Sequence, residues 1–238
     1  MALPSRLQKN GLAFVLHEPP LPNRVRSIPS TQNSTVVGWL PPGVVMSITE
    51  GPVEANGLLW WKIQSDLARL SGWTPERDGS SFFLGPVEER TLCTHATRAR
   101  LHKGDGAVII SPRSIHVRQT PSFEGVITDE FATGTALTIV DGPLCANQIV
   151  WWNIRADALP APRWIAEGQA GQHFLIPTSV NKNGLVAGHY HEVKAGETWG
   201  SLAQRFKSTA MILQTLNPGL KRPGLVLRAG DRLWIPGQ

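Results

Sequence analysis

The chain has 238 residues, 41% of them apolar and 17% charged, which is typical of a folded globular protein rather than a disordered one. Basic side chains outnumber acidic ones by 23 to 18, and residues 189–238 hold seven of the basic and three of the acidic side chains. This basic excess is modest and lacks interleaved aromatic residues, so it argues against nucleic-acid binding. The chain also lacks the apolar run of about 20 residues that a membrane-spanning helix needs, which argues against membrane insertion.

Residues 1–23 are predicted to be an N-terminal extension. The one short apolar run in this segment, "GLAFVL", has no charged region directly before it and no small-residue cleavage site after it. The segment therefore does not have the pattern of a signal peptide. We expect a chain that stays inside the cell, leaves by another route, or has a leader that this sequence lacks.

A tandem repeat follows. The stretch "IVWWNI" at 149–154 is nearly a copy of "LLWWKI" at 58–63, and a shift of 91 residues continues the match without a gap. The matched pairs include Trp60 with Trp151, Trp61 with Trp152, Trp73 with Trp164, Glu76 with Glu167 and Phe83 with Phe174. Upstream, "VRSIP" at 25–29 pairs with "VRQTP" at 117–121. We therefore predict two copies of one module, repeat 1 at 24–88 and repeat 2 at 115–177.

Apolar residues recur at every second position within each repeat, and turn signals such as "PPG" and "EANG" separate these runs. This pattern predicts short antiparallel strands that form a small barrel or sandwich. Consecutive strand residues point to opposite faces, so we expect Trp61 and Trp152 to face inward. Trp60 and Trp151 are then either covered by a neighbouring loop or form an exposed aromatic surface that stacks on sugars or peptides.

With these residues in view, each repeat resembles a bacterial SH3-like (SH3b) domain, a small barrel often found beside cell-wall enzymes. The pattern that carries the resemblance runs from "VRSIPS" through "EGPVEANGLLWWKI" to "GWTPE" in repeat 1, with its counterpart in repeat 2. Ile28 and Thr120 stand where a turn glycine is common in that family. The resemblance therefore implies the fold more than a peptide-binding groove.

The connecting segment 89–114 contains "AVII", which has the character of a strand, and one of the two cysteines. Cys93 and Cys145 fit no metal-binding spacing. They either form one disulfide in an oxidising compartment or remain two buried thiols, and we favour the thiols. A Cys/His catalytic pair of Cys93 and His95 lacks a third, orienting group.

After a linker at 178–188, the apolar period changes in the segment 189–238. "HYHEV" predicts a short strand. Thr198 is a natural N-cap for a helix with Trp199, Leu202, Ala203 and Phe206 on one face. Ser208 or Thr209 then caps a second helix whose apolar face comprises Ile212, Leu213 and Leu216 and which stops at Asn217 and Pro218. "LRAGDRLWIP" predicts a turn and a final strand.

This order of strand, helix, helix and strand closely resembles the LysM domain, a module that binds N-acetylglucosamine-containing glycans such as peptidoglycan and chitin. The matching residues are "VKAGETW" at 193–199, "SLAQRF" at 201–206, "LNP" at 216–218 and "LRAGDRLWIP" at 227–236. The fold expected for the whole chain is mainly β, with two small SH3-like β-barrels followed by a βααβ LysM domain.

The LysM resemblance implies a shallow glycan-binding groove between the loop that opens the first helix and the loop that leaves the second. The residues at these places are Gly196, Glu197, Thr198, Trp199, Asn217, Pro218, Gly219 and Leu220. Backbone groups there can bond acetamido groups, and an apolar wall can receive their methyls. Trp199, where Leu is usual in the family, either lines this groove or packs in the core. Gly200 is a second departure from the family pattern. It stands in the first turn of the predicted helix, where glycine is a poor helix former.

These features favour a non-catalytic adaptor of the bacterial cell envelope that binds peptidoglycan or another N-acetylglucosamine glycan. We expect no enzyme activity, no cofactor and no metal site. His189 and His191, with His173 or Glu192, form only a weak metal candidate. The alternative is a structural subunit of a larger assembly, such as a tail-like particle, filament or envelope complex, that binds other envelope or particle proteins. The adaptor would lie in the cell envelope or outside the cell. The structural subunit would be particle-associated or cytoplasmic.

Overall fold

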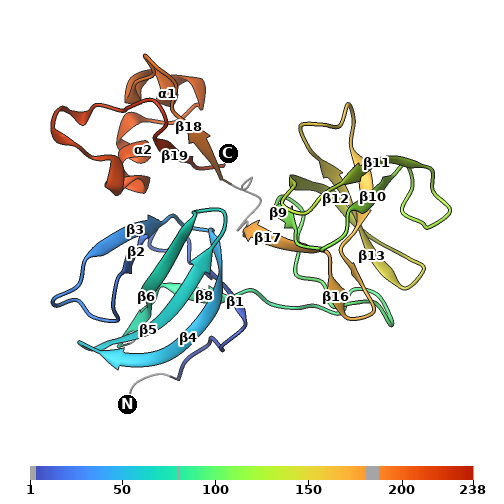
Figure 1. Cartoon of the computed structure of the whole chain (residues 1–238), viewed down its shortest axis with the longest axis horizontal. Helices are drawn as coiled ribbons and strands as arrows, with labels where there is room; N and C mark the ends of the chain where they lie inside the picture. Colours follow the sequence, from blue (N-terminus) through green and yellow to red (C-terminus); the bar gives the residue numbers. More distant parts are fainter. Residues whose placement is uncertain (1–3, 80, 181–187, 238) are drawn as a thin grey trace. The chain divides into compact units, whose positions relative to one another are not determined.

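The computed structural model of the chain describes residues 4–79, 81–180 and 188–237. It divides into two compact units, one made of residues 1–87 with 188–238 and the other of residues 88–187. Most of the predicted linker 178–188 lies outside the described residues. Figure 1 shows a curled β-sheet in each unit and two short helices near the C-terminus. The expected fold class, mainly β with a βααβ end, is confirmed.

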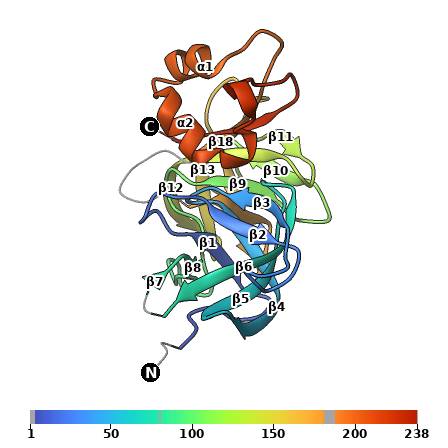
Figure 2. The same cartoon turned by 90° about the vertical axis from the view of Figure 1, so that its left-hand side faces the viewer.

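The first sheet has eight strands. They are β1 (Leu12–Val15), β2 (Asn23–Arg26), β3 (Val36–Leu40), β4 (Val45–Ala55), β5 (Leu58–Ser65), β6 (Leu70–Asp78), β7 (Ser81–Phe82) and β8 (Leu84–Pro86). Their order is β3-β2-β6-β5-β4-β1-β8, with β7 beside β6. The long strands β4 and β5 form an antiparallel hairpin that places Val53 opposite Trp60. Figure 2 shows this hairpin from the side.

The second sheet repeats this topology. Its strands are β9 (Gly106–Ile109), β10 (Ile115–Arg118), β11 (Ile127–Phe131), β12 (Ala136–Ala146), β13 (Ile149–Arg155), β14 (Arg163–Ala166) and β17 (Leu175–Ser179). The order β11-β10-β14-β13-β12-β9-β17 matches that of the first sheet strand for strand. A separate small hairpin joins β15 (Gly168–Gln169) to β16 (Gln172–His173).

Each sheet also includes a strand that lies upstream of the predicted repeats. β1 lies in the predicted extension 1–23 and pairs with β4 and β8, and β9 lies in the connecting segment 89–114 and pairs with β12 and β17. The strand expected at "AVII" is therefore present. The sequence signal for these strands is "RLQK" at 6–9 beside "RLHK" at 100–103. That match needs a shift of 94 residues rather than 91, so a single constant shift misses it.

The paired tryptophans are all buried. Trp61 and Trp152 face the core clusters of their sheets, as predicted. Trp60 and Trp151 are only 1% exposed, so the exposed aromatic surface considered for them is not present. Their indole Nε1 atoms donate to the carbonyl oxygens of Ala55 and Ala146, each at 3.0 Å, which folds each ring back under its own hairpin.

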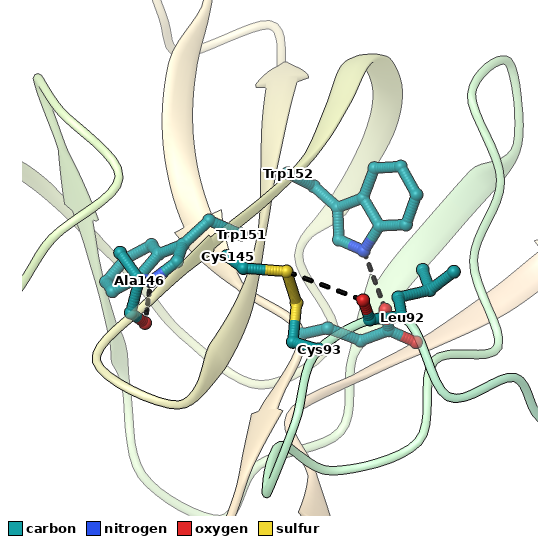
Figure 3. Close-up of a disulfide and its surroundings, with 7 residues drawn as sticks. Leu92, Cys93, Cys145, Ala146, Trp151 and Trp152 are labelled. Atoms are coloured by element: carbon teal, nitrogen blue, oxygen red, sulfur yellow. Dashed lines mark hydrogen bonds between the residues drawn. A yellow bond between two sulfur atoms is a disulfide. The ribbon is translucent and has the colours of Figure 1, made fainter.

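The two cysteines form a disulfide, contrary to the thiols we favoured. Cys93 bonds to Cys145 with their Cα atoms 5.7 Å apart. The bond joins the segment before β9 to strand β12, near Trp151 and Trp152, whose rings point apart in Figure 3. The sequence could not reveal this bond, because the two residues are 52 positions apart and only the tertiary fold brings them together.

The C-terminal module has the predicted βααβ order. Its elements are β18 (His189–Glu192), α1 (Trp199–Arg205), α2 (Ala210–Leu216), the 3-10 turns η1 (Pro218–Leu220) and η2 (Pro223–Leu225), and β19 (Arg232–Ile235). The caps are Thr198 and Thr209, as expected. Ile212, however, is 47% exposed and does not belong to the buried face of α2, which consists of Leu213 and Leu216. No helix in the described ranges is long and apolar enough to cross a membrane.

Candidate functional site

The loop before α1 begins with a tight turn over Lys194–Glu197. Glu197 N–H donates to the Lys194 carbonyl at 3.1 Å, and Gly196 has φ 83°, which glycine adopts without strain. Gly196 is exposed. No other described residue donates to its carbonyl or accepts from its N–H. Both backbone groups of Gly196 are therefore without a partner among the described residues, which suits the ligand-binding role that the LysM resemblance implies for this loop.

The side chain of Glu197 is occupied within the module. Its carboxylate accepts from the backbone N–H of Lys194 at 2.8 Å and from Nη1 of Arg205 at 3.1 Å, and its Oε2 lies 2.7 Å from Nε2 of His191. The Lys194 hydrogen bond, followed by that of His191, lowers the pKa of Glu197. Glu197 thus ties the turn to β18 and α1, and its carboxylate is engaged within the module rather than left open for a ligand.

Thr198 and Trp199 serve the start of α1. Thr198 Oγ1 accepts from the backbone N–H of Ser201 at 3.1 Å, which satisfies a helix donor that lacks an intrahelical partner. Trp199 is 5% exposed and belongs to the core cluster of the module. Core packing, the second of the two interpretations of Trp199, is the one observed. Its Nε1–H has no acceptor within the described part of the chain.

On the other predicted side of the groove, Asn217 is buried, and both polar atoms of its side chain are hydrogen-bonded. Its Nδ2 donates to the carbonyls of Leu213 at 2.7 Å and Trp234 at 2.9 Å, and its Oδ1 accepts from the Trp234 N–H at 2.6 Å. These three bonds fasten the end of α2 to β19. The Asn217 side chain therefore has a structural role and is not left open for a ligand, contrary to its predicted place in the glycan-binding groove.

The residues after Asn217 form the exit loop. Pro218 starts η1, Gly219 is exposed, and Leu220 packs against the core cluster that contains Trp199. The structure thus brings both predicted loops to one small core. What they present outward is mainly backbone, together with the exposed Thr198 and Gly219.

Sequence reasoning missed a contact face between this module and the first sheet. Leu216 and Trp234 are 8% and 2% exposed because they pack into the core cluster of the first sheet. Nη2 of Arg232 donates to the Leu67 carbonyl at 2.9 Å, and its guanidinium lies 4.4 Å from the ring centroid of Tyr190. Burial raises the pKa of Tyr190 to about 12.

The histidines considered for a metal have other contacts. The rings of His189 and His191 pack edge-on against Phe206 at 5.6 and 5.3 Å. His173 lies 2.8 Å from the Arg98 carbonyl. Among the described residues, no group of three or more His, Cys, Asp or Glu side chains is arranged to hold a metal ion.

Comparisons with known proteins support the assignment of the C-terminal module. Residues 191–236 match the family model of the LysM domain, so this module is a LysM domain. LysM domains bind N-acetylglucosamine-containing glycans such as peptidoglycan. No curated protein matches the chain.

Two solved structures show a remote similarity. A structure titled NlpC2 from Trichomonas vaginalis is 10% identical with a TM-score of 0.26, and the match covers 84% of this chain and 56% of that one. The crystal structure of Ly7917 is 15% identical with a TM-score of 0.22, covering 74% of this chain and 65% of that one. The chain thus spans less than two thirds of either structure, and similarity this low carries no argument about its function.

Proposed function

We propose that the protein is a non-catalytic adaptor of the bacterial cell envelope that binds peptidoglycan through its LysM domain. The observation that carries this proposal is the LysM match over residues 191–236. It is supported by the loop before α1, where the exposed backbone of Gly196 has no partner among the described residues. A backbone N–H and C=O in an open turn suit the C=O and N–H of an acetamido group.

The charge of the module supports an anionic polymer as partner. Residues 189–238 carry seven basic and three acidic side chains, whereas the rest of the chain is nearly neutral. Peptidoglycan carries carboxylates on its peptide stems, so this excess strengthens encounter with it. One shallow site binds weakly, and strong retention on a wall follows from many chains on one polymer.

The two repeats then act as a spacer or a second recognition surface. Their residue pattern, strand order and curled sheets support the SH3-like assignment. Cys93, the one thiol considered as a nucleophile, is bonded to Cys145 and so is not a free thiolate. The same bond supports an oxidising compartment, such as the envelope or the outside of the cell.

The proposal is tested by sedimentation of the full chain with insoluble peptidoglycan. We expect the bound fraction to fall when N-acetylglucosamine oligomers compete, and to stay unchanged with cellulose oligomers, which have the same backbone without acetamido groups. Equal competition by both oligomers, or none by either, would contradict the proposal.

A matched pair of variants locates the site. Gly196 in "KAGE" and Gly230 in "RAGD" occupy similar turns, with φ 83° and 88° and open space around the Cβ position. Gly196→Leu and Gly230→Leu therefore introduce a similar backbone strain of about 1–2 kcal/mol. Only Gly196→Leu is expected to weaken sedimentation.

A further inference from the structure

The LysM domain contacts a part of the first sheet whose sequence differs from the corresponding part of the second sheet. Trp39, Leu67 and Leu70 of repeat 1 correspond to Glu130, Ala158 and Ala161 of repeat 2. Leu67 contributes the carbonyl that binds Arg232, and Leu67 and Leu70 pack against the cluster that includes Leu216 and Trp234. The two sheets share one topology, so these differences mark what repeat 1 does in addition to folding.

Trp39 lies at the point where the first sheet meets the exit loop of the groove. A methyl group built on Gly219 would lie 3.4 Å from Cδ1 and 3.8 Å from Nε1 of Trp39. The indole therefore stands beside η1, against one of the residues that the LysM resemblance assigns to the groove. Because Gly219 has no side chain, nothing from that residue separates the exit loop from the ring.

Trp39 differs from the paired tryptophans in its exposure and in the hydrogen bonding of its indole N–H. It is only partly buried, and its Nε1–H bonds to none of the described residues, whereas Trp60, Trp61, Trp151 and Trp152 each donate to a protein oxygen. The guanidinium carbon of exposed Arg24 lies 5.2 Å from the ring centroid of Trp39. An aromatic ring, an indole N–H without an acceptor among the described residues, and a guanidinium thus lie together next to the predicted groove.

This combination suits a sugar ring. The C–H face of a pyranose stacks on an aromatic ring, while the indole N–H and the guanidinium can donate to hydroxyl, acetamido or carboxylate oxygens. We propose that Trp39 binds the saccharide that follows the LysM groove, so that one glycan chain spans the LysM domain and repeat 1. This inference rests on the proposed glycan-binding function and adds a residue from outside the LysM domain to its site.

The proposal predicts a dependence on glycan length. We would measure the Kd of the full chain for N-acetylglucosamine oligomers of about two to six sugars by calorimetry. Trp39→Ala is expected to weaken binding of the longest oligomer about tenfold, or about 1.4 kcal/mol, and to leave the disaccharide unchanged. Trp39→Phe, which retains a stacking face, should recover most of the loss. Glu130→Ala, at the matched position of repeat 2, should change neither Kd.

An NMR titration of the parent chain covers the case in which Trp39→Ala disturbs the contact between the first sheet and the LysM domain. The indole Nε1–H signal of Trp39, identified by its loss in Trp39→Phe, should shift with the longest oligomer and not with the disaccharide. An unmoved signal, or equal Kd values for parent and Trp39→Ala at every length, would overturn the proposal while leaving LysM binding intact. A parent chain that binds no oligomer would overturn the proposed function, and this inference with it.

Discussion

Glu76 and Glu167 are buried carboxylates that occupy matched positions in the two sheets. Trp61 and Trp152 donate their indole N–H groups to these carboxylates at 2.7 and 2.6 Å. The backbone N–H groups of Arg6 and Arg100 donate to them at 2.7 and 2.5 Å. Each glutamate thereby fastens the chain that leads into the first strand of its sheet, which explains why a Trp and a Glu recur together in the repeat.

We expect Glu167→Gln to lower the free energy of unfolding of the second unit by about 2–4 kcal/mol. Burial raises the pKa of Glu167, and hydrogen bonds from Arg100, Trp152 and Leu101 oppose that rise. A glutamine has only one acceptor oxygen, so its NH2 group would face one of these donors. Urea denaturation followed by hydrogen exchange of residues 88–187 measures the loss.

A double-mutant cycle checks the cause of that loss. Trp152→Phe removes the indole donor, so Glu167→Gln should cost less in that background than in the parent. Asp157→Asn, at an exposed position of the same unit, serves as the control and should cost almost nothing. Additive costs for the two changes would contradict the assigned contact.

At the scale of elements, the LysM domain contains the same type of turn twice. The turns "KAGE" at 194–197 and "RAGD" at 228–231 each end in an acid that accepts from the backbone N–H of the first residue, at 2.8 Å in both cases. Val193 N–H donates to the Asp231 carbonyl, and Gly230 N–H donates to the Val193 carbonyl, both at 2.8 Å. The two turns are therefore joined through the backbone of Val193, whereas the shape of each turn depends on its own acid.

This arrangement predicts a pH dependence for the turn that contains Glu197. Its pKa in the folded state is lowered, so the folded protein binds the Glu197 proton less tightly than the unfolded chain does. The contribution of Glu197 to stability is then present above the usual glutamate pKa of about 4.3 and is lost as the pH falls through the lower folded value.

The amide proton signal of Lys194, which donates to Glu197, reports this titration by NMR. We expect a midpoint below about 4.3 in the parent and no such transition in Glu197→Gln. The matched variant Asp231→Asn should instead remove the transition at Arg228, the corresponding donor. A Lys194 midpoint at or above the usual value would show that the carboxylate is not held as described.

At the scale of the whole molecule, the disulfide lies within one of the two compact units. Cys93 and Cys145 both lie within residues 88–187, and repeat 1 has no cysteine. Replacing both with serine should destabilise this unit by about 2–4 kcal/mol, because the bond closes a long loop in the unfolded chain. Hydrogen exchange by mass spectrometry should then rise across residues 88–180 and stay unchanged in residues 4–79 and 188–237. An equal rise in all three ranges would contradict a stabilising effect confined to residues 88–187.

The sequence alone determined the duplication, the strand character of the repeats and the LysM domain with its helix caps. These features follow from local patterns: alternation in strands, a 3.6-residue period in helices, and Thr198 and Thr209 placed before apolar faces. The candidate site could be predicted as two loops, because the LysM motif places Gly196 and Gly219 next to recognisable helix ends. Only the tertiary structure decided what each side chain does there.

Trp199 packs in the core of the LysM domain, and Asn217 forms hydrogen bonds within that domain. The rings of Trp60 and Trp151 are covered by their own hairpins. The sequence did not decide these outcomes, because burial depends on the neighbours that the tertiary structure supplies. The Cys93–Cys145 bond and the contact of the LysM domain with the first sheet join residues far apart along the chain. The periodicity of apolar residues along the sequence does not predict which distant residues come into contact. The physical reason is that local patterns report which face of an element is apolar, whereas the partner that covers the face is set by the packing of the whole unit.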